Sequence, residues 1–126
     1  MTAKKIAILT SGGDAPGMNA CIRAVTLAAA SDGIDVIGFR HGYNGLLENE
    51  WVQLTTQMVH NLLQRGGTIL HSARCEKFKL PEQIKLAGQV LENHELDGLI
   101  VVGGNGSFLG ALALQAVWNK PVIGIP

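Results

Sequence analysis

Charge of either sign is scarce in this sequence, and aromatic residues are scarcer still. Charged residues make up 16% and aromatic residues 5% of the 126 residues, and the formal net charge is zero. No block of five or more Lys and Arg residues occurs, which argues against nucleic acid or a membrane surface as the main partner. The chain also lacks an apolar run of about 18 residues and a signal peptide, so we expect no membrane span and a cytoplasmic location.

Cysteine and the common nucleotide motifs are equally sparse. The two cysteines, Cys21 and Cys75, form no CxxC pair, and the histidines share no ligand spacing, so neither a disulfide framework nor a histidine metal site is expected. The Walker sequence GxxxxGK[ST] is absent, which excludes a P-loop NTPase by sequence. A dinucleotide enzyme is disfavoured, because the third glycine of a GxGxxG fingerprint falls one residue late, at Gly110.

Glycine is plentiful, and two glycine-rich stretches follow aliphatic runs. We call residues 11–17 (SGGDAPG) and 103–107 (GGNGS) the two glycine bends. Each has the pattern of a strand, a tight turn and the start of a helix. Glycines let a phosphate approach the backbone closely, and the N-terminus of a helix attracts anions. With Ser107 predicted to cap the second helix, the two bends together predict a phosphate-handling site.

The order of patterns along the chain predicts an α/β fold. Aliphatic strand segments alternate with helical segments as β-α-β-α-β-α-β, joined by short connections. This order favours a three-layer, doubly wound, mostly parallel sheet with helices on both faces. Residues 41–45 and 71–78 are predicted to be loops, and residues 69–70 to be extended. We expect these two loops to join the glycine bends at one rim of the sheet.

Two helices are predicted to bury a particular face. The helix from Ser107 to 118 should turn Leu109, Leu112 and Ala116 toward the core. A helix capped by Thr55 or Thr56 should bury four apolar residues, which are Met58, Val59, Leu62 and Leu63.

Four stretches resemble successive motifs of the ATP-dependent 6-phosphofructokinase family of the bacterial type. They are KKIAILTSGGDAPGMN (4–19), HGYNGL (41–46), RGGTILHSARCEKF (65–78) and DGLIVVGGNGSFLGA (97–111). The resemblance implies a cytosolic, tetrameric glycolytic kinase that moves the γ-phosphoryl of ATP to fructose 6-phosphate, with Mg²⁺ as cofactor. It also implies that residues 1–126 form a nucleotide-binding domain, incomplete at its C-terminus, and that this chain forms homo-oligomers.

Carried over position by position, the resemblance implies a site for ATP or ADP. Its residues are Gly13, Tyr43, Arg74, Cys75, Gly103, Gly104, Asn105, Gly106 and Ser107. Gly13 would lie beside the phosphates and Tyr43 over the nucleotide. Arg74 and Cys75 would contact the phosphate and adenosine end. In the family, a small residue at the position of Gly106 admits ATP, whereas relatives that use pyrophosphate carry aspartate there.

Two features of the chain depart from the active pattern of the family. The family has the sequence GGDGS where this chain has GGNGS, so Asn105 stands in place of an aspartate. An amide oxygen is a poorer partner for Mg²⁺ than a carboxylate. We therefore expect weak use of Mg-ATP. The segment with the catalytic base would lie beyond Pro126, so no catalytic residue and no phosphofructokinase activity are expected from residues 1–126 alone.

The regulatory site of the family is also only partly matched. Arg23 stands at one of its basic positions. Leu27, Thr56 and Asn61 stand where arginine, arginine and aspartate are typical. Because anionic effectors need positive charge, control by ADP or phosphoenolpyruvate is not expected.

Two other functions are compatible with the glycine bends. A different kinase with a GGDG-type turn, such as an NAD kinase, would share the second bend but not TSGGDAPGMN. A non-catalytic nucleotide-binding or regulatory module would bind nucleotide without turnover.

Overall fold

A five-stranded sheet with β1 at its centre organises the fold. The computed structural model describes residues 4–12, 17–62, 66–72 and 75–126. Its elements are β1 (Lys5–Thr10), α1 (Met18–Ser31), β2 (Asp35–Phe39), α2 (Gly42–Glu48), β3 (Trp51–Leu54), α3 (Thr56–Val59), the 3₁₀ helix η2 (Glu76–Lys79), α4 (Pro81–Asn93), β4 (Gly98–Val102), α5 (Asn105–Val117) and β5 (Val122–Ile125). The strand order is β3-β2-β1-β4-β5. All neighbouring strands are parallel except β2 and β3.

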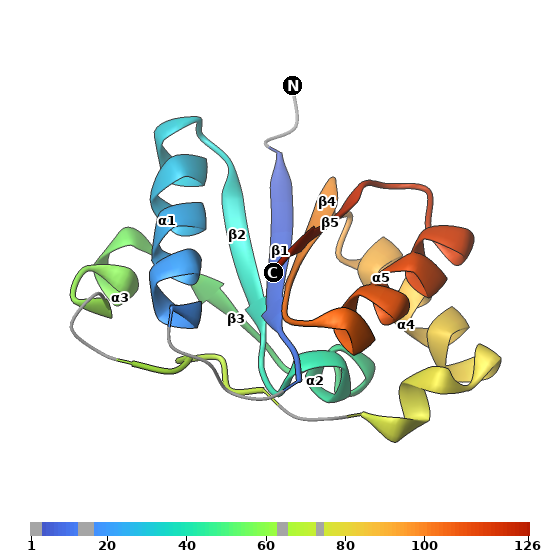
Figure 1. Cartoon of the computed structure of the whole chain (residues 1–126). Helices are drawn as coiled ribbons and strands as arrows, with labels where there is room; N and C mark the ends of the chain where they lie inside the picture. The colour runs from blue at the N-terminus through green and yellow to red at the C-terminus, as the bar shows by residue number, and fades with distance from the viewer. Residues whose placement is uncertain (1–3, 13–16, 63–65, 73–74) are drawn as a thin grey trace.

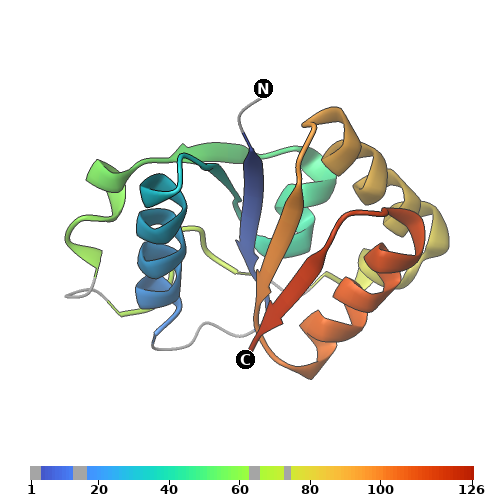
Figure 2. The same cartoon turned by 90° about the horizontal axis from the view of Figure 1, so that it is seen from above.

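Helices cover both faces of this sheet. Figures 1 and 2 show α1 and α3 on one side, and α2, α4 and α5 on the other. The predicted three-layer, mostly parallel α/β fold is therefore confirmed, with β3 as an antiparallel edge strand. Among the described residues, no helix has the length and apolar character needed to cross a membrane.

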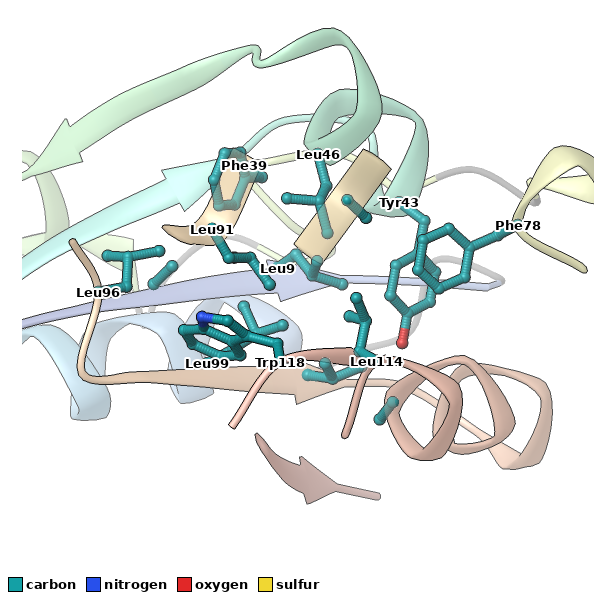
Figure 3. Close-up of a cluster of buried hydrophobic side chains, with 14 of the residues drawn as sticks. Leu9, Phe39, Tyr43, Leu46, Phe78, Leu91, Leu96, Leu99, Leu114 and Trp118 are labelled. Atoms are coloured by element: carbon teal, nitrogen blue, oxygen red, sulfur yellow. The ribbon is translucent and has the colours of Figure 1, made fainter. Parts of the chain in front are cut away.

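The two core clusters arise from the alternation of side chains along the strands. Ala7 and Leu9 of β1 face the layer of α2, α4 and α5, where Trp118 is also buried (Figure 3). Ile8 faces α1 and α3 instead. Cys21 packs against this second cluster, and burial raises the pKa of its thiol. This placement agrees with the packing role expected for an unpaired cysteine on an apolar helix face.

The predicted inward face of α5 is wrong. Leu109 and Leu112 are 68% and 69% exposed, and Ala116 is exposed as well. The helix instead buries Ser107 and Ala111, together with Leu114 further along. Because α5 is apolar almost all round, its sequence pattern could not select a face. The small residues near the start of the helix are buried because α5 contacts α2 and the sheet there.

Three local predictions are also corrected by packing. Residues 41–45 are not a loop, because α2 begins at Gly42, and residues 69–70 form a turn instead of an extended segment. Thr55 caps α3 as predicted, with its hydroxyl accepting from the amide of Met58. The Met58 side chain is nevertheless 43% exposed. Val59 of the four-residue α3 and Leu62 just beyond it are buried as predicted, and Leu63 lies outside the described residues.

His94 should make the stability of the fold depend on pH. Burial, and then the positive charge of Lys5, hold the pKa of His94 below its ordinary value. The unfolded chain therefore binds the proton more readily, and stability is lost as pH falls from about 6.5 through the lowered pKa. We expect His94→Gln to lose less free energy of unfolding than the wild type between about pH 7 and 5, as measured by urea denaturation. Lys5→Gln should reduce the pH dependence in part, and equal slopes for all three proteins would contradict this prediction.

Candidate functional site

The two glycine bends begin side by side at the carboxyl edge of the sheet. β1 pairs in parallel with β4, with Thr10 opposite Val102, and the amide of Ser11 donates to the carbonyl of Val102 at 2.9 Å. From β1 the chain passes to β2 on one side, whereas β4 lies on the other. Such a switch in strand order opens a crevice outside the strand ends, where ligands of doubly wound sheets bind.

A cavity of about 720 Å³ opens beside these bends. Its described lining comes from the ends of β1 and β4, from α2, from residues 75–84 and from α5. The lining residues are Ser11, Gly12, Tyr43, Cys75, Phe78, Lys79, Ile84, Gly104, Gly106, Ser107, Leu109, Gly110 and Ala113. Its volume is in the range of small-molecule sites, and it combines an apolar wall with a backbone-rich end.

Most of the site residues predicted from the sequence lie at this cavity. Five of them line it, namely Tyr43, Cys75, Gly104, Gly106 and Ser107. Gly103 and Asn105 are in the same turn, although they do not form part of the lining. Gly13 and Arg74 fall outside the described residues.

The apolar wall of the cavity and the charged residue beside it were not predictable from the sequence. Phe78, Ile84 and Leu109 contribute apolar surface, and Lys79 is the only charged side chain among the described lining residues. Phe78 was within a predicted loop, and Leu109 was assigned to the core. Their spacing along the chain carries no signal for a shared cavity, because η2, α4 and α5 meet only in the tertiary structure.

Tyr43 links three elements around the cavity. α2 carries its ring into the core, where it stacks on Phe78 with centroids 4.0 Å apart and planes 14° apart. Its hydroxyl donates to the backbone carbonyl of Ser107 at 2.6 Å. Burial raises the pKa of Tyr43 well above its ordinary value, so the hydroxyl stays protonated and remains a donor at physiological pH.

The Ser107 side chain lies next to Gly12 of the first glycine bend and Gly103 of its own bend, and it does not cap α5. The helix begins at Asn105, Gly104 is its N-cap residue, and no side chain caps it. A β-carbon on Gly103 would collide with the Ser107 hydroxyl and would lie 2.7 Å from the carbonyl oxygen of Ser11, and one on Gly12 would lie 3.6 Å from the same hydroxyl. Ser107 is 5% exposed and lines the cavity. Glycine at position 103 therefore permits the close approach of the two bends.

Polar side chains hold the segment after residue 66 against the first bend. The buried Asn19 accepts from the amide of Ile69 at 2.6 Å and donates to the carbonyl of Gly66 at 3.2 Å. Thr10 donates to the carbonyl of His71 at 2.9 Å. These contacts tie residues 66–71 to the end of β1 and the start of α1.

A family model described as phosphofructokinase matches residues 5–126, a span that includes both glycine bends. The chain belongs to the phosphofructokinase family. This assignment replaces the alternative of an NAD kinase, which was based on the second bend alone. The TSGGDAPGMN stretch, which argued against that alternative, lies within the matched span.

Similar proteins in the phosphofructokinase family are longer than this chain. The ATP-dependent 6-phosphofructokinase of Thermotoga neapolitana is 50% identical over 123 residues, which cover 98% of this chain and 39% of that protein. The enzyme of the same name from Thermoanaerobacter sp. strain X514 is 53% identical over 123 residues, with 98% and 38% covered. The crystal structure of Pichia pastoris phosphofructokinase has a TM-score of 0.91 and 37% identity, covering 99% of this chain and 15% of that one. The chain thus spans about two-fifths of the length of its curated relatives.

The described part of this candidate site does not fit a protein-bound Mg²⁺. The described lining contains no carboxylate, and no group of three or more His, Cys, Asp or Glu among the described residues could hold a metal ion. The exposed Asn105 at the start of α5 offers only a neutral amide oxygen. Since Mg²⁺ prefers charged oxygen ligands, these residues provide no strong position for it.

The positions matched to the regulatory site of the phosphofructokinase family lie in another layer. Arg23 and Leu27 are on α1, and Thr56 and Asn61 are at the two ends of the α3 region, all on the face of the sheet opposite α2, α4 and α5. Leu27 packs against the second core cluster, so it presents no charge to an effector. The Nε of Arg23 is buried and has no hydrogen-bond partner in the described part of the chain.

Proposed function

We propose that the cavity binds ATP, with the triphosphate at the two glycine bends and the adenosine against the apolar wall. The observation that carries this proposal is the pairing of β1 with β4, which brings both bends to one switch point beside a cavity of about 720 Å³. The N-terminus of α5 supports it, because free backbone N–H groups and the helix dipole favour anions there. Ser107, buried next to Gly12 and Gly103, adds a hydroxyl at the same end.

The chain would then supply the nucleotide-binding part of an ATP-dependent 6-phosphofructokinase. Such an enzyme transfers the γ-phosphoryl of ATP to fructose 6-phosphate. Phosphoryl transfer depends mainly on positioning and on neutralising charge. In this proposal the glycine bends position the phosphates, Lys79 adds positive charge, and Gly13 and Arg74 contribute as the family resemblance implies. Mg²⁺ would arrive with ATP, held chiefly by the phosphates.

The remaining functional assignments follow from the family and not from contacts in this chain. We propose a cytoplasmic, homo-oligomeric glycolytic kinase without the family's usual control by ADP. The family resemblance supports the first part of this proposal. The uncharged Leu27 and the substitutions at Thr56 and Asn61 support the second.

Binding measurements on the chain test the proposed site directly. We expect isothermal titration calorimetry to detect binding of both ATP and inorganic tripolyphosphate. ATP should bind more tightly, because its adenosine also contacts the apolar wall. Gly103→Ala should weaken the binding of both ligands by at least about tenfold, because the new β-carbon forces the bends apart by a fraction of an ångström or more.

Gly66→Ala is the matched control for this substitution. A β-carbon on Gly66 meets nothing within 4 Å, so its affinity for ATP should equal that of the wild type. Absence of any binding of ATP or tripolyphosphate to the folded wild-type chain would refute the proposed function.

A further inference from the structure

The hydroxyl of Tyr43 points to the backbone of α5. Figure 3 shows the ring beside Phe78, with its oxygen pointing to α5. The oxygen lies 2.6 Å from the carbonyl oxygen of Ser107, in the first turn of that helix. The ring contributes to the cavity wall, whereas the hydroxyl is engaged by the protein itself.

We propose that Tyr43 is a positioning residue that fixes the first turn of α5, and through it the spacing of the two glycine bends. This inference rests on the proposed function, because it assigns that spacing to the binding of a polyphosphate. The hydroxyl acts on the phosphate end of the site without touching the ligand. The ring faces the nucleoside end.

Close packing leaves the Tyr43 ring a single position. The ring is 4% exposed and is stacked on Phe78. A β-carbon on Gly110 would lie 2.9 to 3.0 Å from the ring and the hydroxyl. Glycine at this position therefore lets α5 lie directly against the ring. A side chain that cannot move can hold its hydrogen-bond acceptor in place.

The carbonyl that Tyr43 holds belongs to Ser107, whose side chain lies where the two bends meet. The Ser107 side chain lies next to both Gly12 and Gly103. If the carbonyl of Ser107 moves, the Ser107 hydroxyl and the N–H groups of the first turn of α5 move with it. The phosphate end of the cavity is thus coupled to a phenol on α2, an element that contributes no residue to either bend.

Tyr43→Phe isolates the hydroxyl, because it keeps the ring and its stacking. Calorimetry with ATP, tripolyphosphate and adenosine then separates the two ends of the ligand. We expect a loss of about three- to tenfold in affinity for ATP and tripolyphosphate, and unchanged affinity for adenosine. Native-state hydrogen exchange should show faster exchange at the amide of Phe108, which donates to the carbonyl of Gly104 at 3.1 Å.

Thr26→Val is the matched control. Thr26 is 2% exposed, and its hydroxyl donates to the backbone carbonyl of Ile22 at 2.8 Å within α1, on the other face of the sheet. Like Tyr43→Phe, the Thr26→Val variant loses one buried hydrogen bond from a hydroxyl to a backbone carbonyl. Its affinities for all three ligands, and the exchange at Phe108, should stay at wild-type values, so that a general loss of stability cannot reproduce the Tyr43→Phe result.

Each outcome decides the inference. Selective loss of phosphate affinity together with faster exchange at Phe108 supports it. Equal losses for adenosine and ATP show that the hydroxyl contacts the nucleoside, and unchanged exchange shows that it does not hold the turn; either result overturns the inference while leaving the ATP site intact. If the wild-type chain binds no phosphate compound at all, the proposed function fails, and the inference falls with it.

Discussion

Gly45→Ala should destabilise the fold by at least about 3 kcal/mol, more than most single substitutions do. Gly45 is buried within α2, and a β-carbon at this position would run into the carbonyl group of Arg40. The obstacle is backbone, so rotation of a side chain cannot relieve it. The amide of Glu50 donates to the carbonyl of Gly45 at 2.8 Å, and that of Arg40 donates to the carbonyl of Glu50 at 2.9 Å. Moving α2 therefore also breaks its connections to β2 and β3.

The opposite sign is expected for a second helical glycine. A β-carbon on Gly106 in α5 meets nothing within 4 Å, so Gly106→Ala should stabilise the chain by about 0.5–1 kcal/mol through helix propensity. Urea denaturation followed by circular dichroism measures both variants. A Gly45→Ala protein within about 1 kcal/mol of the wild type would show that α2 is not held as the structure has it.

Asn105→Asp should convert ATP binding from nearly independent of Mg²⁺ to strongly dependent on it. The described lining offers no carboxylate to a cation, and Asn105 is exposed at the start of α5 beside the candidate phosphate position. A carboxylate there supplies the charged oxygen that Mg²⁺ prefers. We expect the variant to bind Mg-ATP on the order of tenfold to a hundredfold more tightly than the wild type. In EDTA it should bind free ATP more weakly, because like charges then repel.

This crossing of affinities distinguishes a metal effect from a general gain in stability. An aspartate in the first turn of a helix is itself stabilising by about 0.3–1 kcal/mol, but that gain does not depend on Mg²⁺. Asn119→Asp adds the same charge at an exposed position beyond α5, and it should leave both affinities unchanged. Calorimetry with and without Mg²⁺ measures the difference. Equal Mg²⁺ dependence for Asn105→Asp and the wild type would disprove a role for this position in Mg-ATP binding.

The strands were predictable because their signal is local and strong. Short aliphatic runs can be recognised without knowing their neighbours, and β1, β4 and β5 each coincide with such a run. Helix α4 begins at Pro81, where proline suits a first turn. The weaker cases are elements whose conformation depends on contact. The glycines Gly42 and Gly45 of α2 favour a loop in the sequence pattern. The segment is helical because Tyr43 and Leu46 are buried in the core.

At the site, the two glycine bends, the family pattern and the departure at Asn105 could all be recognised from residue identity and from spacing within short segments. Three features of the site depend instead on how the elements pack. Ser107 lies next to the first bend without capping α5, the Tyr43 hydroxyl donates to a backbone carbonyl, and Leu109 lines a cavity. They could not be predicted because α5 is apolar on nearly every side. Its orientation is therefore set by close contact with the Tyr43 ring at Gly110, a contact between residues far apart in the chain that no local pattern records.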